Sequence, residues 1–144
     1  MDVAGRRGGR RTDEAAWRNL VVAADPDGSL DAALLLRRTG TPLAAWTREA
    51  VPVDVVSVMA ATLVGSVETM VEAVHCASPQ SIRMEADQCQ MLATKVNPRT
   101  ILALIAPSRI PEAQIRHLAR VLASRLAGDL VKEPRRAVAP TSTA

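Results

Sequence analysis

The sequence predicts one α/β domain of the α+β type, in which helices flank a five-stranded antiparallel sheet in the order α-β-β-α-β-β-β-α. Three observations lead to this prediction. Hydrophobic residues switch repeatedly between helical and strand periods, Gly- and Pro-bearing turns separate the segments, and one long helical segment stands between two groups of short strands. The 144 residues, of which 48% are hydrophobic and 23% charged, fit a single folded domain with short tails.

The first helix is predicted over residues 13–24, where the apolar side chains recur at helical spacing on one side: Trp17, Leu20, Val21 and Ala24. A turn stops this helix, because Pro and Gly favour turns. A hairpin is expected next, from two short apolar strands that flank a Gly- and Pro-bearing turn. These segments are residues 25–28 for the first turn, 30–37 and 43–46 for the strands, and 39–42 for the turn between them.

The longest helix is predicted over residues 53–76. Pro52 opens it, and Asp54 lies in its first turn, where negative charge suits the helix dipole. Three strands follow, and the last of them, residues 100–106, is so continuously apolar that we expect it at the centre of the sheet, covered on both faces. An amphipathic helix over residues 111–126 ends the domain. The other two strands are expected over residues 81–85 and 89–96.

Positive charge is concentrated at the two ends of the chain. The formal net charge is +3, yet residues 13–130, taken as the domain, hold 11 basic and 13 acidic residues. Residues 1–12 and 131–144 have the compositions of disordered tails, the first of them basic. Binding of these tails to nucleic acid or to an anionic surface is one function class that the charge leaves open. Solvated ends are the plainer interpretation, because no groove-reading motif accompanies them.

Composition disfavours several classes of protein. Trp17 and Trp46 are the only aromatic residues, whereas readers of single-stranded nucleic acid need aromatic stacking platforms, so nucleic acid is not the expected partner. No contiguous apolar run approaches the roughly 18 residues of a membrane span, and the N-terminus lacks the apolar core of a secretory signal. We therefore expect a cytoplasmic protein without membrane association. Cys76 and Cys89 are then expected to be reduced thiols, in apolar surroundings where cysteine acts as a small hydrophobe.

The long helix is more apolar than one sheet face can cover. A surface helix usually has one apolar stripe, but this helix has two rows side by side: Val55, Met59, Leu63, Met70 and Val74 in one, and Val56, Ala60, Val64, Val67 and Val71 in the other. Gly65 costs about 1 kcal/mol relative to Ala inside a helix, which suggests the close approach of another backbone. We therefore expect part of this helix to meet a second subunit, with loops or chain ends as the alternative cover.

The strand over residues 81–85 points to the same association. Ile82 and Met84 alternate with charged residues, and at a sheet edge the free backbone groups of this strand would invite pairing with another strand. A two-fold dimer that pairs these strands would also align the long helices. The predicted dimer interface therefore contains Gly65, Ile82 and Met84.

Catalytic and metal sites have little support in this sequence. The opening of an EF-hand loop at Asp25 would require Gly and Glu where Leu30 and Leu36 stand, so a turn is the better interpretation. A zinc site is disfavoured because the candidate ligands fit no paired spacing: His75, Cys76, Cys89 and His117. Glu68 and Glu72, one helical turn apart, are interpreted as solvated side chains. We predict no catalytic, cofactor-binding or metal-ligating residue, no cofactor, and no enzyme activity of the chain's own.

Three segments carry a resemblance to a known family. They are AALLLRRTGTPLA at residues 32–44, VMAATLVGS at residues 58–66, and residues 101–106 followed by Pro111, Glu112 and Ala113. Together they resemble the Roadblock (dynein light chain) domain family over about residues 13–126. The resemblance implies a profilin- and longin-like sandwich, and a homodimer with one continuous sheet across both subunits.

The resemblance also implies a function, which is to bind small Ras-like GTPases and, in some prokaryotic members, to activate their hydrolysis. By analogy, the partner surface would be the exposed stripe of the paired long helices: Ser57, Ala61, Thr62, Ser66, Thr69 and Glu72. Arg48, in the loop before the long helix, is the nearest candidate for an arginine finger. The alternative is a scaffold or adaptor subunit that uses the same helix pair without regulating a GTPase.

Overall fold

The computed structural model describes the backbone of residues 8–126 and the side chains of residues 14–126. Within that range the chain order is α-β-β-α-β-β-β-α, as predicted. The elements are α2 (Gly8–Ala24), β1 (Ala32–Arg37), β2 (Pro42–Thr47), α3 (Val53–Ala73), β3 (Ser81–Glu85), β4 (Cys89–Asn97), β5 (Thr100–Pro107) and a final helix over residues 112–126.

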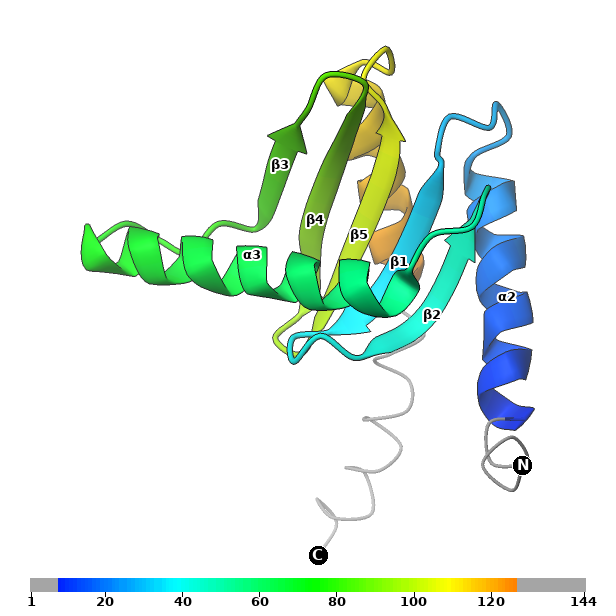
Figure 1. Cartoon of the computed structure of the whole chain (residues 1–144), viewed down its shortest axis with the longest axis horizontal. Helices are drawn as coiled ribbons and strands as arrows, with labels where there is room; N and C mark the ends of the chain where they lie inside the picture. The colour runs from blue at the N-terminus through cyan, green and yellow to red at the C-terminus, as the bar shows by residue number, and fades with distance from the viewer. Residues whose placement is uncertain (1–7, 127–144) are drawn as a thin grey trace, which may run out of the picture.

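The five strands form one antiparallel sheet in the order β2-β1-β5-β4-β3 (Figure 1). The most apolar strand, β5, lies at the centre, as its composition predicts. Among the described strands, β3 lies at an edge of the sheet and pairs with β4 alone. The condition for strand pairing with a second copy is therefore met.

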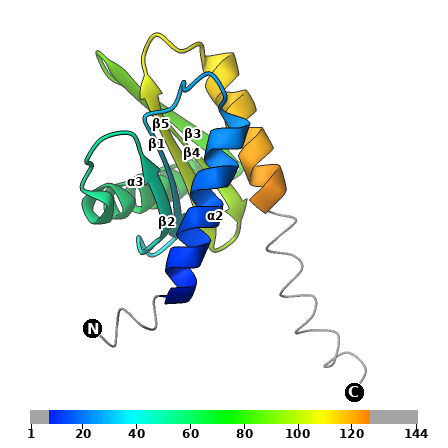
Figure 2. The same cartoon turned by 90° about the vertical axis from the view of Figure 1, so that its right-hand side faces the viewer.

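Helices cover both faces of the sheet. Helix α3 crosses one face, whereas α2 and the final helix lie side by side on the other (Figure 2). The alternation of β1 illustrates how the two cores arise: Leu34 and Leu36 point into the core on the α3 side, while Ala33 and Leu35 point into the core under α2 and the final helix. Trp17 joins the second core, and its indole N–H donates to the carbonyl of Ala33 at 3.0 Å.

Two helix boundaries differ from the sequence prediction. Helix α2 begins at Gly8 instead of Asp13, so residues 8–12 lie in a helix where a disordered tail was expected; arginine is a good helix former and extends a helix nucleated by its apolar face. Helix α3 ends at Ala73 instead of Cys76, because His75 takes a left-handed conformation with φ of 63°. Residues 1–7 and the expected C-terminal tail, residues 131–144, lie outside the described residues.

Helix α3 differs from the expectation that no segment is long and apolar enough to span a membrane. Among the described residues it is the one helix long and apolar enough to cross a membrane, with a mean hydropathy of 1.4 over 18 residues, 22% of them buried. Small Ser, Thr and Gly residues interrupt its apolar runs but barely lower its mean hydropathy, which is why the sequence shows no long apolar run. Length and composition alone are weak grounds for a span, since helices of layered domains pass the same test.

Candidate functional site

The outer face of α3 is apolar and open to solvent. We call Val55, Met59, Met70 and Val74 the outer row; each of these side chains is between 59% and 65% exposed. The neighbouring row is turned to the sheet, where Ala60 and Val64 are buried and Val56 packs against the core. As predicted, one sheet face does not cover both rows, but Leu63, which was expected in the first row, packs partly buried against the core. Exposed apolar surface of this kind usually marks an interaction site.

The C-terminal half of α3 and the edge strand β3 extend this surface. Figure 1 shows α3 running past β3 and ending beyond the sheet edge. On β3, Met84 is exposed, whereas Ile82 packs partly buried against the core on the α3 side. The structure thus places apolar side chains on the protruding helix and at an unpaired strand edge, and both features favour association.

Five of the six predicted partner-binding residues are at least partly accessible, and one is not. Thr62, Ser66, Thr69 and Glu72 are exposed, and Ala61 is partly buried against the core. The prediction that Ser57 contacts a partner is wrong. Ser57 is fully buried, and its hydroxyl has no hydrogen-bond partner in the described structure. The helical period aligns Ser57 with the sheet-facing Ala60 and Val64. The exposed stripe of small and polar residues is therefore narrower than predicted and does not include Ser57.

The exposed hydroxyls of this stripe are turned back to their own helix. Thr62 donates to the carbonyl of Val58 at 2.8 Å, and Thr69 donates to the carbonyl of Gly65 at 3.0 Å. A Cβ added at Gly65 would meet nothing within 4 Å. No backbone in the described residues therefore approaches Gly65 closely, and the expected close approach stays a prediction about a second chain.

Glu68 links the C-terminal half of α3 to the sheet, so the interpretation of this residue as solvated is wrong. Its carboxylate pairs with Arg38 in the β1–β2 turn and accepts from Lys95 Nζ on β4 at 2.7 Å. The Ser78 hydroxyl donates to it at 3.2 Å. The hydrogen bond from Lys95, followed by those from Arg38 and Ser78, holds the pKa of Glu68 below its ordinary value against the opposing effect of burial. Three separate chain segments therefore fix the position of α3.

The Glu68→Gln substitution is expected to lower the free energy of unfolding at neutral pH by about 1 to 2 kcal/mol, because two cations lose a half-buried partner. Since the folded-state pKa is lowered, the stabilisation is present above the ordinary carboxyl pKa and disappears as the pH falls through the lowered value. Urea titrations of both proteins across the acidic range should therefore converge at low pH.

Glu72→Gln is the matched control, because Glu72 is exposed on the same helix and makes no ion pair among the described residues. Its stability should follow that of the unmodified chain at every pH. An equal loss in both variants would mean that the Glu68 ion pairs contribute nothing to stability.

The candidates for metal binding do not form a site among the described residues. The Asp25 carboxylate accepts the backbone N–H groups of Ser29 and Leu30, each at 2.9 Å, which makes it the organiser of a turn, as interpreted from the sequence. Cys76 and Cys89 are both exposed, contrary to the apolar surroundings predicted, because Cys76 follows the end of α3 and Cys89 opens β4. Within the described range, no three His, Cys, Asp or Glu side chains gather at one point.

Comparison with known proteins rests on structure. No protein-family model and no curated protein matches this sequence. An MglB with a tetrameric arrangement matches with a TM-score of 0.71 at 15% identity, covering 79% of this chain and 87% of that one. Myxococcus xanthus MglB matches with a TM-score of 0.70 at 13% identity, covering 76% and 90%. A Roadblock/LC7 domain from Streptomyces avermitilis gives 0.66 at 15% identity, covering 72% and 87%.

The chain has the Roadblock/LC7 fold. At identities this low the likeness is one of fold, and profilins share it more distantly: Acanthamoeba castellanii profilin II gives a TM-score of 0.55 at 14% identity, covering 76% of this chain and 94% of that one. The expected profilin-like sandwich is thereby confirmed.

Within the Roadblock/LC7 fold of this chain, Arg48 is held in place. Its guanidinium donates to the carbonyls of Gly28 at 2.8 Å and Leu30 at 2.6 Å, and lies 3.4 Å from the Asp31 carboxylate. It also lies over the Trp46 ring at 5.6 Å from the centroid. Arg48 thus ties the turn after α2 to the end of β2. Its use as an arginine finger would require these contacts to break. The contacts could not be predicted from the sequence, because the hydrogen-bond partners lie 18 and 20 residues away.

Proposed function

We propose that this chain is a non-catalytic, cytoplasmic interaction module that forms a homodimer and binds and regulates a small Ras-like GTPase. The observation that supports this most is the outer row of α3, which is apolar, exposed, and carried on a Roadblock/LC7 fold. The tetrameric arrangement named for one MglB of this fold supports association between copies of the chain. The resemblance of residues 32–44, 58–66 and 101–106 to Roadblock domains supports a GTPase as the partner.

In the proposed dimer, the β3 edges pair and the two α3 helices lie alongside each other. Pairing would satisfy the free backbone groups of β3 and cover apolar side chains of α3 that would otherwise face water. The exposed Thr62, Ser66 and Thr69 would then form part of the surface offered to the GTPase. The ion pairs of Glu68 with Arg38 and Lys95 speak against a membrane-spanning role, since a charged pair anchored on the sheet would have to be broken.

A scaffold or adaptor role without GTPase activation is the second candidate, and the fixed position of Arg48 favours it over an arginine-finger mechanism. Four contacts hold that guanidinium, so stimulation of hydrolysis would have to act by ordering the catalytic residues of the GTPase itself. Binding without activation needs no such step.

The purified chain, immobilised and exposed to host lysate, is expected to retain a small GTPase in the presence of a non-hydrolysable GTP analogue and to release it with GDP. The reason is that the switch segments of such GTPases change their order with the γ-phosphate, so a regulator distinguishes the two states. Mass spectrometry identifies the retained protein, and the measurement is repeated with that protein purified.

The Thr62→Arg variant should lose the nucleotide-dependent retention, because it places a bulky charge on the proposed partner surface. Ala23→Arg is the control, since Ala23 is exposed on α2, which lies on the opposite face of the sheet. Retention of the same GTPase in both nucleotide states, or none in either, would leave the scaffold role and remove the regulatory one.

A further inference from the structure

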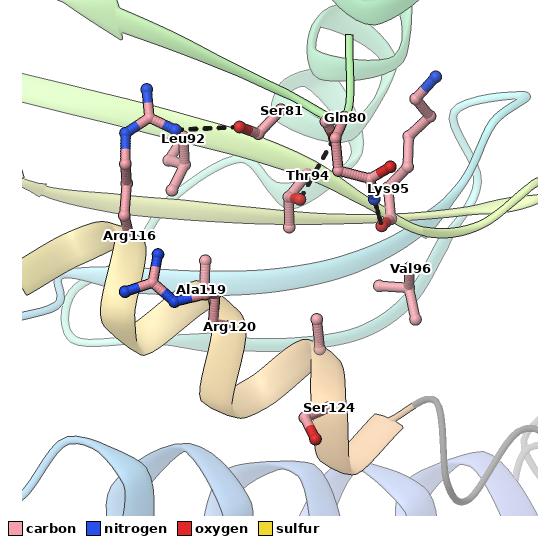
Figure 3. Close-up of a pocket in the computed structure, with 11 residues that line it drawn as sticks. Gln80, Ser81, Leu92, Thr94, Lys95, Val96, Arg116, Ala119, Arg120 and Ser124 are labelled. Atoms are coloured by element: carbon pink, nitrogen blue, oxygen red, sulfur yellow. Dashed lines mark hydrogen bonds between the residues drawn. The ribbon is translucent and has the colours of Figure 1, made fainter. Parts of the chain in front are cut away.

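A pocket of about 620 Å³ lies between strands β3 and β4 and the final helix (Figure 3). It is on the face of the sheet opposite α3 and therefore apart from the proposed partner surface. Its size falls within the range of roughly 300 to 1,000 Å³ that is typical of small-molecule sites. The pocket exists because the final helix passes over β4 with small side chains, Ala119 and Ala123, turned toward the strands.

One end of the pocket is cationic. The side chains of Arg116 and Arg120 lie at the same end of the pocket, that of Arg116 next to Ser81 (Figure 3). Arg116 donates to the Ser81 hydroxyl at 3.0 Å and to the Glu112 carboxylate at 2.7 Å, which leaves further N–H donors free. Arg120 is exposed and makes no ion pair with any described residue. Among the described residues the lining contains no acidic side chain, but Glu112 beside it pairs with Arg116, so the unneutralised charge at this end is that of Arg120.

The rest of the pocket lining is mixed: apolar side chains of β4 and the final helix stand beside the polar Gln80, Thr94 and Ser124. Leu92 and Val96 of β4 face Ala119 of the final helix across it. The Thr94 hydroxyl between them is already engaged, donating to the carbonyl of Gln80 at 3.3 Å. The third cation of the lining, Lys95, contributes no charge here, because its ammonium group pairs with Glu68 on the α3 side of the sheet.

We propose that this pocket binds a small amphipathic anion, with a carboxylate or phosphate group between Arg116 and Arg120 and a short apolar body along the partly exposed Val96 and Ala123. Planar guanidinium groups with free donors match both kinds of anion, often through two parallel hydrogen bonds. The apolar floor gains by covering a hydrocarbon body of matching size. The ligand would bridge the final helix and the edge of the sheet.

The test is a titration of the ¹⁵N-labelled full chain with octanoate and with octyl phosphate, followed by amide chemical shifts. Both probes should shift the amides of Ser81, Thr94 and Val96, and comparing them shows which head group is preferred. Acetate and 1-octanol, which lack the apolar body and the charge respectively, should bind at least about tenfold more weakly, because each makes only half of the contacts.

Arg120→Gln should weaken the binding of the better probe by about tenfold, because a charge-assisted hydrogen bond is lost. Arg125→Gln is the matched control: Arg125 is exposed on the same helix but does not line the pocket, so the change should stay within about twofold. The proposal is overturned if neither probe shifts these amides at millimolar concentration. Equal binding of 1-octanol, or equal losses in the two variants, overturns the anion recognition.

Discussion

Replacing Met59 with glutamate is expected to convert a two-chain assembly into single chains. Met59 lies in the outer row and is 60% exposed in the single chain, so the substitution costs the isolated fold little. In an interface the same carboxylate would be desolvated without a partner, which we expect to weaken association by at least about 100-fold. Sedimentation velocity over a range of concentrations measures the effect directly.

Val22→Glu is the control for this substitution. Val22 is 52% exposed on α2, on the opposite face of the sheet, so the same change of charge there should leave the assembled mass as it is. Thermal unfolding followed by circular dichroism shows that both variants are folded. If Met59→Glu assembles like the unmodified chain, the outer row is not the dimer interface, and the proposed pairing of α3 helices is wrong.

The fold was predictable because local patterns determine most of it. Residues 101–106 are apolar without interruption, and a short run of this kind favours a strand covered on both faces, which placed β5 at the centre. The double apolar row of α3 likewise predicted that one row would stay exposed. Both inferences depend on the period of neighbouring residues, which the sequence shows directly.

The details of the surface were less predictable, because they depend on contacts between distant segments. A helical period places Ser57 beside both the apolar and the polar stripe, and only the seating of α3 on the sheet decides that it is buried. Glu68 pairs with residues 30 and 27 positions away, which the strand order brings together. The pocket was missed for the same reason: Ala119 and Arg120 indicate little until the final helix is laid over β4.

Gly40→Ala is expected to lower the free energy of unfolding by about 2 to 4 kcal/mol, from backbone strain and from displacement of a packed helix. Gly40 lies in the β1–β2 turn with φ of 101°, a conformation that side chains rarely adopt. An added Cβ would also lie 3.2 Å from the Val58 Cα and 3.3 Å from its Cγ2. The turn therefore packs directly against the N-terminal half of α3. Urea unfolding measures the contribution of this contact to the free energy of unfolding.

Gly28→Ala separates these two costs. Gly28 also has a positive φ, 68°, but its Cβ would meet only the end of the Arg48 side chain at 3.4 Å, so we expect a loss of about 1 to 2 kcal/mol from the backbone alone. Equal losses in the two variants would show that α3 does not depend on the turn for its position. Because Val58 adjoins Met59, a displaced α3 would move the outer row relative to β3, so Gly40→Ala should also weaken association in sedimentation velocity while Gly28→Ala leaves it unchanged.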